Sequence, residues 1–118
     1  MASHNELGKK GEHIAQNYLQ QQRYTVLHTN WKWGRKEIDV IASKDDHLVF
    51  VEVKTRINDL FGWPEDKVDY KKRRYLQGAA EVFLERSQLT PAAIRFDIIA
   101  ITFTHGAEYE VVHFEDAF

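Results

Sequence analysis

The stretch HLVFVEVKTR, residues 47–56, decides what kind of fold the chain adopts. Its valines, leucine and phenylalanine are typical of a strand in the interior of a sheet, but Glu52 and Lys54 interrupt the apolar run. Side chains alternate between the two faces of a strand, so both charges share a face with Leu48 and Phe50. The segment therefore predicts a central strand that ends in an acid and a base.

The surrounding segments predict one mixed α/β domain that covers residues 1–118, with a central β-sheet flanked by helices. Apolar residues at helical spacing predict helices over residues 3–22 and 64–87, the first opening with the capping-box sequence Ser-His-Asn-Glu. Strands are predicted for five segments rich in β-branched and aromatic residues: 23–31, 36–43, 47–55, 94–103 and 108–114. Short turns join the first three strands, which favours an antiparallel meander.

Composition narrows the class of protein. With 43% hydrophobic and 29% charged residues, the chain is globular rather than disordered. No apolar run approaches the roughly 18 residues that cross a membrane, and the N-terminus lacks the apolar stretch of a signal peptide, so we expect no membrane contact. The absence of cysteine excludes disulfides and thiolate metal sites and is consistent with the cytoplasm. The net charge of −2 means that nucleic-acid binding would require a local basic patch.

A second acid lies on the strand before the central one. Strict alternation along that strand predicts that Glu37, Asp39 and Ile41 share one face. Ile38, Val40 and Ala42 then share the opposite face. Neighbouring strands lie about 4.8 Å apart, so Asp39 and Glu52 can share one ion. Two buried carboxylates repel each other, and a divalent cation such as Mg²⁺ or Mn²⁺ offsets that cost. The alternative is a strand-end ion pair between Glu52 and Lys54, with Asp39 merely near a turn.

Such an ion would suit phosphodiester hydrolysis. A bound divalent cation can hold the phosphate that is cleaved, lower the pKa of an attacking water and stabilise the leaving oxygen. Lys54 shares a face with Glu52, where it can orient that water or neutralise developing charge. The pattern of two acids and a lysine therefore indicates a metal-dependent nuclease site.

Three further charged residues belong to the same hypothesis. Glu12 aligns with Ala15 at the margin of the first helix's apolar stripe, where it either leans toward the sheet or stays in solvent. Lys72 falls within the apolar stripe of the second helix, so it either points inward, as phosphate binding would require, or snorkels to the edge. Asp97 opens an interior strand and is either another site acid or solvent-facing.

The start of the second helix carries a basic run. KVDYKKRRY, residues 67–75, has five basic residues and one acid. The run predicts either a solvated helix face or a phosphate-binding patch made by Lys71, Lys72, Arg73 and Arg74. Basic residues elsewhere that can extend such a patch are Lys9, Lys10, Arg35 and Lys36.

Five segments of the chain, GKKGEHIAQNYL, EIDVIA, LVFVEVKTR, KKRRYLQGAAEVFL and RFDIIAI, resemble the YraN-like family of uncharacterised bacterial proteins. That family is related to the archaeal Holliday-junction resolvases and to the PD-(D/E)xK nuclease superfamily. The resemblance covers nearly the whole chain and implies the restriction-endonuclease-like fold, an α/β fold with a central mixed sheet. One departure is Lys36, which stands where the family typically has a glycine before Glu-Ile-Asp.

The resemblance also implies roles for individual residues. Carried over by motif, the catalytic set is Glu12, Asp39, Glu52 and Lys54. The metal would be held by Asp39, Glu52 and the carbonyl of Val53. The lysine that opens the family's second-helix motif falls on Lys72.

The leading hypothesis is a Mg²⁺- or Mn²⁺-dependent DNA endonuclease that acts on branched or structured DNA. Resolution of a two-fold junction calls for paired sites, which is consistent with a homodimer. One alternative is a non-catalytic DNA- or RNA-binding protein on the same fold. Another is an interaction module that uses the aromatic residues in or beside loops, which are Trp31, Trp33, Phe61 and Trp63.

Overall fold

The computed structural model describes residues 4–57, 70–104 and 108–118. Helix α1 spans His4–Gln21 and helix α2 spans Tyr70–Ser87. The strands are β1 Thr25–Trp33, β2 Lys36–Lys44, β3 His47–Ile57, β4 Ala93–Phe103 and β5 Tyr109–Phe114. The order of elements matches the sequence prediction. The predicted start of the second helix at Pro64 lies outside the described residues, as do Phe61 and Trp63.

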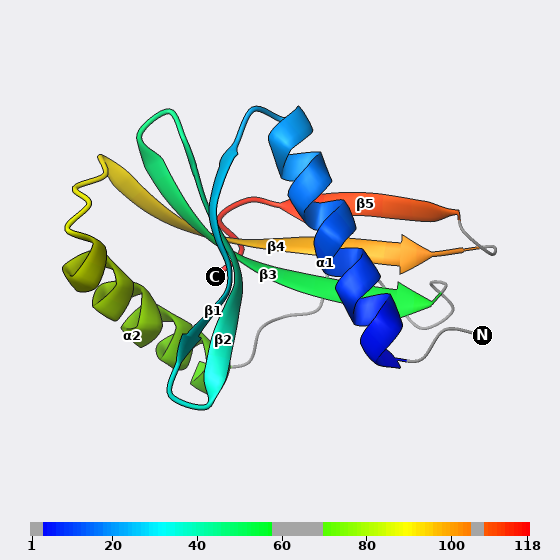
Figure 1. Cartoon of the computed structure of the whole chain (residues 1–118), viewed down its shortest axis with the longest axis horizontal. Coiled ribbons are helices and arrows are strands. Elements are labelled where there is room, and N and C mark those ends of the chain that lie inside the picture. The colour runs from blue at the N-terminus through cyan, green and yellow to red at the C-terminus, as the bar shows by residue number, and fades with distance from the viewer. Residues whose placement is uncertain (1–3, 58–69, 105–107) are drawn as a thin grey trace.

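The five strands form one mixed sheet in the order β1-β2-β3-β4-β5 (Figure 1). Strands β1, β2 and β3 pair antiparallel, which confirms the predicted meander. Strand β4 pairs parallel to β3, and β5 pairs antiparallel to β4. A parallel neighbour requires a crossover connection, and α2 lies within the segment that makes it.

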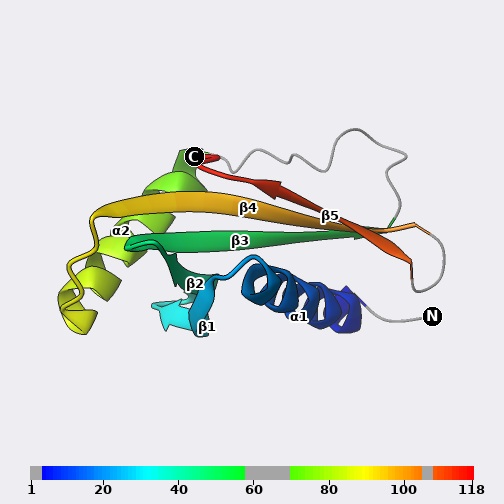
Figure 2. The same ribbon diagram turned by 90° about the horizontal axis from the view of Figure 1, so that it is seen from above.

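The two helices pack on opposite faces of the sheet. Val49 and Val51 belong to the core cluster that contains α1, and Leu48 and Phe50 belong to the cluster that contains α2. Figure 2 shows α1 lying along one side of β3 and β4. All four β3 side chains are buried, so the predicted central strand is confirmed. Glu52 follows Phe50 on the α2 face, because side chains alternate along the strand.

Strand β2 departs from the strict alternation predicted for it. Val40 packs in the α1 cluster and Ile41 in the α2 cluster, as expected, but Ile38 joins Ile41 rather than Val40. The backbone pairing of β2 with β3 begins only at Val40 opposite Val51. Before that pair, β1 is the only described strand that pairs with β2, so β2 twists away from β3 and its side chains change face. The assignment of Ile38 to the face of Val40 was wrong for this reason.

A glycine lets α1 approach β3 closely. A Cβ atom placed on Gly11 would lie 2.1 Å from Oγ1 of Thr55, far inside normal contact. The helix backbone therefore lies almost directly against the strand at this point. Because Glu12 is the next residue, the same close approach sets how near its side chain comes to the sheet.

We predict that Gly11→Ala lowers the free energy of unfolding by about 1–3 kcal/mol, because the added methyl group overpacks the α1–β3 contact. The matched control is Gly8→Ala in the same helix, where an added Cβ meets nothing within 4 Å. That change should stabilise the protein by up to about 1 kcal/mol through helix propensity. Urea unfolding followed by circular dichroism measures both. The double variant Gly11→Ala/Thr55→Ala removes the Thr55 hydroxyl and methyl groups, so it should recover much of the lost free energy of unfolding. If Gly11→Ala and Gly8→Ala stabilise the protein equally, the close contact between Gly11 and Thr55 is contradicted.

Candidate functional site

The candidate site lies where β2 leaves β3. The β2–β3 ladder runs from Lys44 opposite His47 to Val40 opposite Val51. Beyond it, the Val53 N–H donates to Oδ2 of Asp39 at 2.8 Å. A side chain thus accepts the hydrogen bond that a backbone carbonyl of β2 would otherwise take. The split between the two strands places the Asp39 carboxylate against the edge of β3.

The acids meet in a cavity of about 300 Å³ at this split. It is lined by Glu37, Asp39, Glu52, Lys72, Tyr75 and Leu76. Glu52 is only 7% exposed, and the ammonium group of Lys72 donates to its Oε1. Lys72 thus points inward toward the acids, which was one of the two interpretations of the helix pattern. Strands β2 and β3 supply the acids, and α2 supplies the base.

The Asp39 carboxyl is held in an environment that disfavours its charge. Burial and then the neighbouring charge of Glu52 raise the pKa of Asp39 to about 7. The hydrogen bond from Val53 works in the opposite direction, Glu12 raises the pKa further, and Lys72 lowers it. Groups whose pKa is strongly shifted by burial and by a neighbouring charge cluster at functional sites, so the Asp39 carboxyl beside Glu52 marks this cavity as a candidate site.

An asparagine that the sequence analysis missed connects Glu12 to this site. Asn30 lies in β1, across from Asp39 in β2. The pairs on either side of it fix this register, because Thr29 lies opposite Val40 and Trp31 lies opposite Ile38. Its amide Nδ2 donates to Glu12 at 3.1 and 3.4 Å from the two oxygens.

The same amide also donates to Oε1 of Glu37 at 3.4 Å. Asn30 has a φ of 50°, a left-handed conformation that asparagine adopts more readily than most residues. A neutral donor therefore holds Glu12 from α1 and Glu37 from β2 together at the exposed margin of the site. An asparagine within an alternating strand was the only sequence signal for this contact.

Lys54 and Val53, two of the residues to which the family resemblance assigns a role, are not among the residues that line the acid cavity. Lys54 is half-buried opposite Ala100 in the β3–β4 ladder, and it does not line the acid cavity. Val53 meets the site through its N–H group. Within the described ranges, no group of three or more His, Cys, Asp or Glu residues is arranged to hold a metal. The catalytic and metal-binding roles that the resemblance implies all stay predictions, for Glu12, Asp39, Glu52 and Lys54 as well as for the Val53 carbonyl.

Asp97 belongs to a different network. It is fully buried, and its register opposite Val51 directs it to the α1 face, away from Glu52. Its carboxylate accepts four hydrogen bonds, from Arg95 Nε and Nη2 at 2.8 Å each, His113 Nε2 at 2.7 Å and the Asp116 N–H at 2.9 Å. Burial works to raise the pKa of Asp97, but these bonds outweigh it and leave the pKa below its usual value. Asp97 is therefore a structural acid rather than a site acid.

The basic run on α2 is divided in the structure. Lys71 and Arg74 are exposed, and the guanidinium of Arg74 lies 5.8 Å from the centre of the Tyr70 ring. Lys72 is paired with Glu52, and Arg73 is half-buried. The Nε atom of Arg73 is buried without a hydrogen-bond partner among the described residues. Among the described residues of the run, Lys71 and Arg74 are thus the basic residues that solvent reaches most freely.

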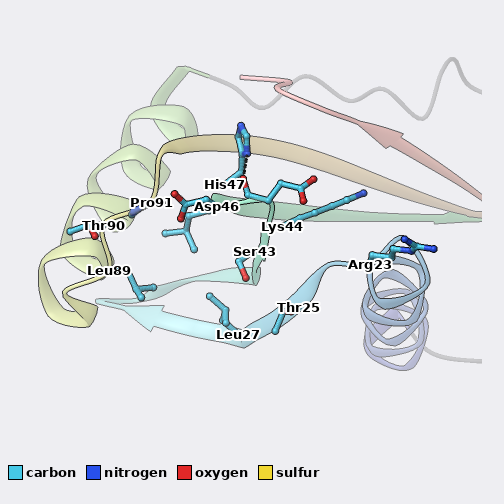
Figure 3. A pocket seen from close by; sticks show the side chains of 12 residues that line it. Arg23, Thr25, Leu27, Ser43, Lys44, Asp46, His47, Leu89, Thr90 and Pro91 are labelled. Carbon is cyan, nitrogen blue, oxygen red and sulfur yellow. Dashed lines mark hydrogen bonds between the residues drawn. The ribbon is translucent and has the colours of Figure 1, made fainter.

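A larger cavity, of about 830 Å³, lies at the other end of β2, around the β2–β3 turn and the segment before β4. In Figure 3, Arg23 and Lys44 lie toward one end of this cavity, and Leu89, Thr90 and Pro91 lie toward the other. Its lining contains no pair of buried acids. In the part of the chain that the structure describes, no helix is long and apolar enough to span a bilayer.

Comparison with known proteins identifies the family. The model of "Uncharacterised protein family UPF0102" matches residues 11–101, and the chain belongs to this family. A UPF0102 protein of Flavobacterium psychrophilum is 45% identical over 118 residues, which cover 100% of this chain and 98% of the relative. UPF0102 proteins of Bacteroides thetaiotaomicron and Parabacteroides distasonis are each 42% identical over 118 residues, covering 100% of this chain and 96% of the relative. The predicted family resemblance is confirmed.

The raised pKa of Asp39 predicts a pH-dependent stability. The folded-state pKa of about 7 exceeds the unfolded value of about 4, so the folded protein binds more protons between these pH values. The free energy of unfolding contributed by this group therefore falls as pH rises from about 4 to about 7. Asp39→Asn keeps an oxygen for the Val53 N–H but cannot ionise. We expect it to match the wild type near pH 4 and to be more stable at pH 8 by on the order of 2 kcal/mol.

Urea unfolding across this pH range measures the difference. Glu85→Gln, at an exposed carboxyl on α2, is the matched control and should show no such divergence. A difference between wild type and Asp39→Asn that stays constant from pH 4 to pH 8 would contradict the shifted pKa.

Proposed function

We propose that the protein is a Mg²⁺- or Mn²⁺-dependent endonuclease of the restriction-endonuclease-like fold that hydrolyses phosphodiester bonds in branched or structured DNA. The observation that carries the proposal is the meeting of Asp39 and Glu52 in one cavity at the β2–β3 split, beside a lysine. A pair of largely buried carboxylates destabilises the fold unless something of opposite charge compensates it. Selection for a stable domain alone gives no reason to keep both acids there.

The residues present fit a hard divalent cation. Mg²⁺ and Mn²⁺ prefer oxygen ligands, and carboxylates with a backbone carbonyl supply them. In an extended strand the N–H and C=O groups of one residue point toward the same neighbour, so the Val53 carbonyl would face the Asp39 side as its N–H does. When bound, the ion would polarise the phosphate and acidify an attacking water.

The remaining side chains have separate tasks in this proposal. Lys72 neutralises Glu52 when no ion is present and would turn to the phosphate once an ion takes its place, a change open to it because its side chain is 34% exposed. Lys54 would orient the attacking water, which forms a bond to phosphorus as the bond to the leaving sugar oxygen breaks. Glu12, held by Asn30, would bind water at the margin of the ion.

The exposed cations Lys71 and Arg74 on α2 would bind the DNA backbone beside this cavity. We place the protein in the cytoplasm, where DNA is accessible in bacteria, and propose a homodimer for two-fold junctions. A non-catalytic nucleic-acid-binding protein is the second candidate. One observation favours it: Lys72 already compensates Glu52, so part of the charge balance is achieved without a cation.

We predict that Asp39→Asn and Glu52→Gln each reduce DNA cleavage at least about 100-fold, because each removes a charged group that stabilises the transition state through the metal. The assay incubates duplex, flap, fork and four-way-junction DNA with Mg²⁺ or Mn²⁺ and separates the products on a denaturing gel. Glu85→Gln, which changes the same kind of charge at an exposed position, should retain wild-type activity. Full cleavage by either acid variant in a nuclease-free preparation would reject the assignment.

A second prediction separates the enzyme from the non-catalytic protein without an activity assay. Lys72→Met removes the compensating charge of Glu52 and should destabilise the ion-free protein by about 1–3 kcal/mol, less than for a fully buried pair because Lys72 is partly exposed. A cation at 100 times its dissociation constant stabilises a folded protein by about 2.7 kcal/mol. Saturating Mn²⁺ should therefore raise the melting temperature of the wild type, and raise that of Lys72→Met further.

The control is Lys71→Met, which removes an exposed lysine from the same helix and should behave as the wild type does. If Mn²⁺ stabilises none of the three proteins, the acid pair does not bind a cation, and the non-catalytic function is favoured instead.

A further inference from the structure

A second cavity opens beside the acid cavity, at the tip of the β1–β2 hairpin. It has a volume of about 430 Å³ and is lined by Lys32, Gly34, Arg35 and Glu37. Glu37 also lines the acid cavity, so the two cavities share a wall. Besides Glu37, the acid cavity contains the carboxyl groups of Asp39 and Glu52, and the second cavity contains two cations. We call the second one the hairpin cavity.

The hairpin tip is fixed to α2 rather than standing free. The hydroxyl group of Tyr75 donates to the carbonyl of Trp33, and the two rings lie with centroids 5.1 Å apart at an angle of 37°. The Trp33 ring also approaches Gly78, where an added Cβ would be only 3.4 Å from two ring atoms. Figure 1 shows the tip of the β1–β2 hairpin beside the first turns of α2. The hairpin cavity is therefore held in place next to Lys72.

The charges of the hairpin cavity are open to a ligand. Lys32 and Arg35 are exposed, and neither has a carboxylate partner within residues 4–57, 70–104 and 108–118. The one acid in the wall, Glu37, accepts a hydrogen bond from Asn30. Two cations that converge on a cavity without a partner suit an anion, and the arginine fork suits the oxygens of a phosphate in particular.

We propose that the hairpin cavity binds a backbone phosphate adjacent to the one at the acid cavity, so that a nucleic-acid strand runs from α2 to the hairpin tip. A ligand with one anionic group can occupy only one of two cavities that share a wall. A polymer with phosphates repeated along a strand can occupy both. The inference rests on the proposed function for its partner, and it adds Lys32 and Arg35 as the residues that hold the strand.

The test measures the salt dependence of DNA binding. A labelled four-way junction is titrated with protein in Ca²⁺ at several KCl concentrations, and a denaturing gel afterwards confirms that the DNA is intact. The slope of log affinity against log salt falls by about 0.9 for each duplex phosphate contact that is lost. Lys32→Ala/Arg35→Ala removes the one phosphate contact of the hairpin cavity, so it should lower the slope by about 0.9 and weaken binding by about tenfold or more at low salt.

The matched control is Arg23→Ala/Lys44→Ala, which removes the same charge from two residues that line the larger cavity at the other end of β2 (Figure 3). It should keep the wild-type slope, since a general loss of positive charge would affect both pairs alike. Melting temperatures check that both double variants fold. A wild-type slope for Lys32→Ala/Arg35→Ala would overturn the assignment of the hairpin cavity.

Two further outcomes separate this inference from its premise. If the wild type binds no DNA or RNA at any salt concentration, the nucleic-acid partner of the proposed function fails as well. If the wild type binds and Lys32→Ala/Arg35→Ala keeps both the wild-type slope and the wild-type affinity, the proposed function stands and the hairpin cavity is not part of the path. Inorganic phosphate should displace no more DNA than KCl of equal ionic strength, and stronger displacement would indicate a discrete phosphate ligand instead of a strand.

Discussion

The hydrogen bond from the Val53 N–H to the Asp39 carboxylate is the constraint on which the candidate site depends. Strand β3 lies in the middle of the sheet, and its backbone groups need partners on both sides. Where β2 turns away, a carboxylate supplies the missing acceptor for the Val53 N–H. Because a side chain replaces the backbone acceptor, β2 and β3 can separate next to a packed core without leaving the Val53 N–H unpaired. The same replacement puts the Asp39 carboxyl group at a position that water only partly reaches.

Asp97 and Asp39, both within the residues that the structure describes, are largely buried acids of two kinds, and the contrast between them supports a functional role for one. Asp97 is surrounded by four donors, and its pKa lies below the usual value, so its charge is stable inside the fold. Asp39 has a single backbone donor and an acid neighbour, and its pKa is raised to about 7. The first arrangement ties β4 to β5 and to the residues that follow β5. The second leaves carboxylate oxygens available to a ligand, at a cost in stability that the Asp97 network does not carry.

The sequence predicted what depends on local pattern. Alternation in β3 correctly assigned Leu48 and Phe50 to one face of the sheet. Helical spacing gave an inward-pointing Lys72 as one of two interpretations, and the structure has it. Both patterns apply to regular, well-packed elements. The pattern failed at Ile38, where β2 has lost one of its neighbours and twists. Asn30 and the Tyr75–Trp33 contact were missed because each joins elements distant in sequence, and single-chain periodicity carries no information about such pairs.

A site at a split in a sheet can receive side chains from both faces, whereas a site on one face cannot. Helix α1 approaches from one side through the Gly11–Thr55 contact and brings Glu12, and α2 approaches from the other and brings Lys72. The two helices meet different core clusters, so the relative position of Glu12 and Lys72 is set by the packing of the whole domain. Small changes in either core should therefore alter the site without touching its charged residues. This dependence makes the acid pair a sensitive reporter of packing, because uncharged residues such as Gly11 and Asn30 fix where the charged side chains lie.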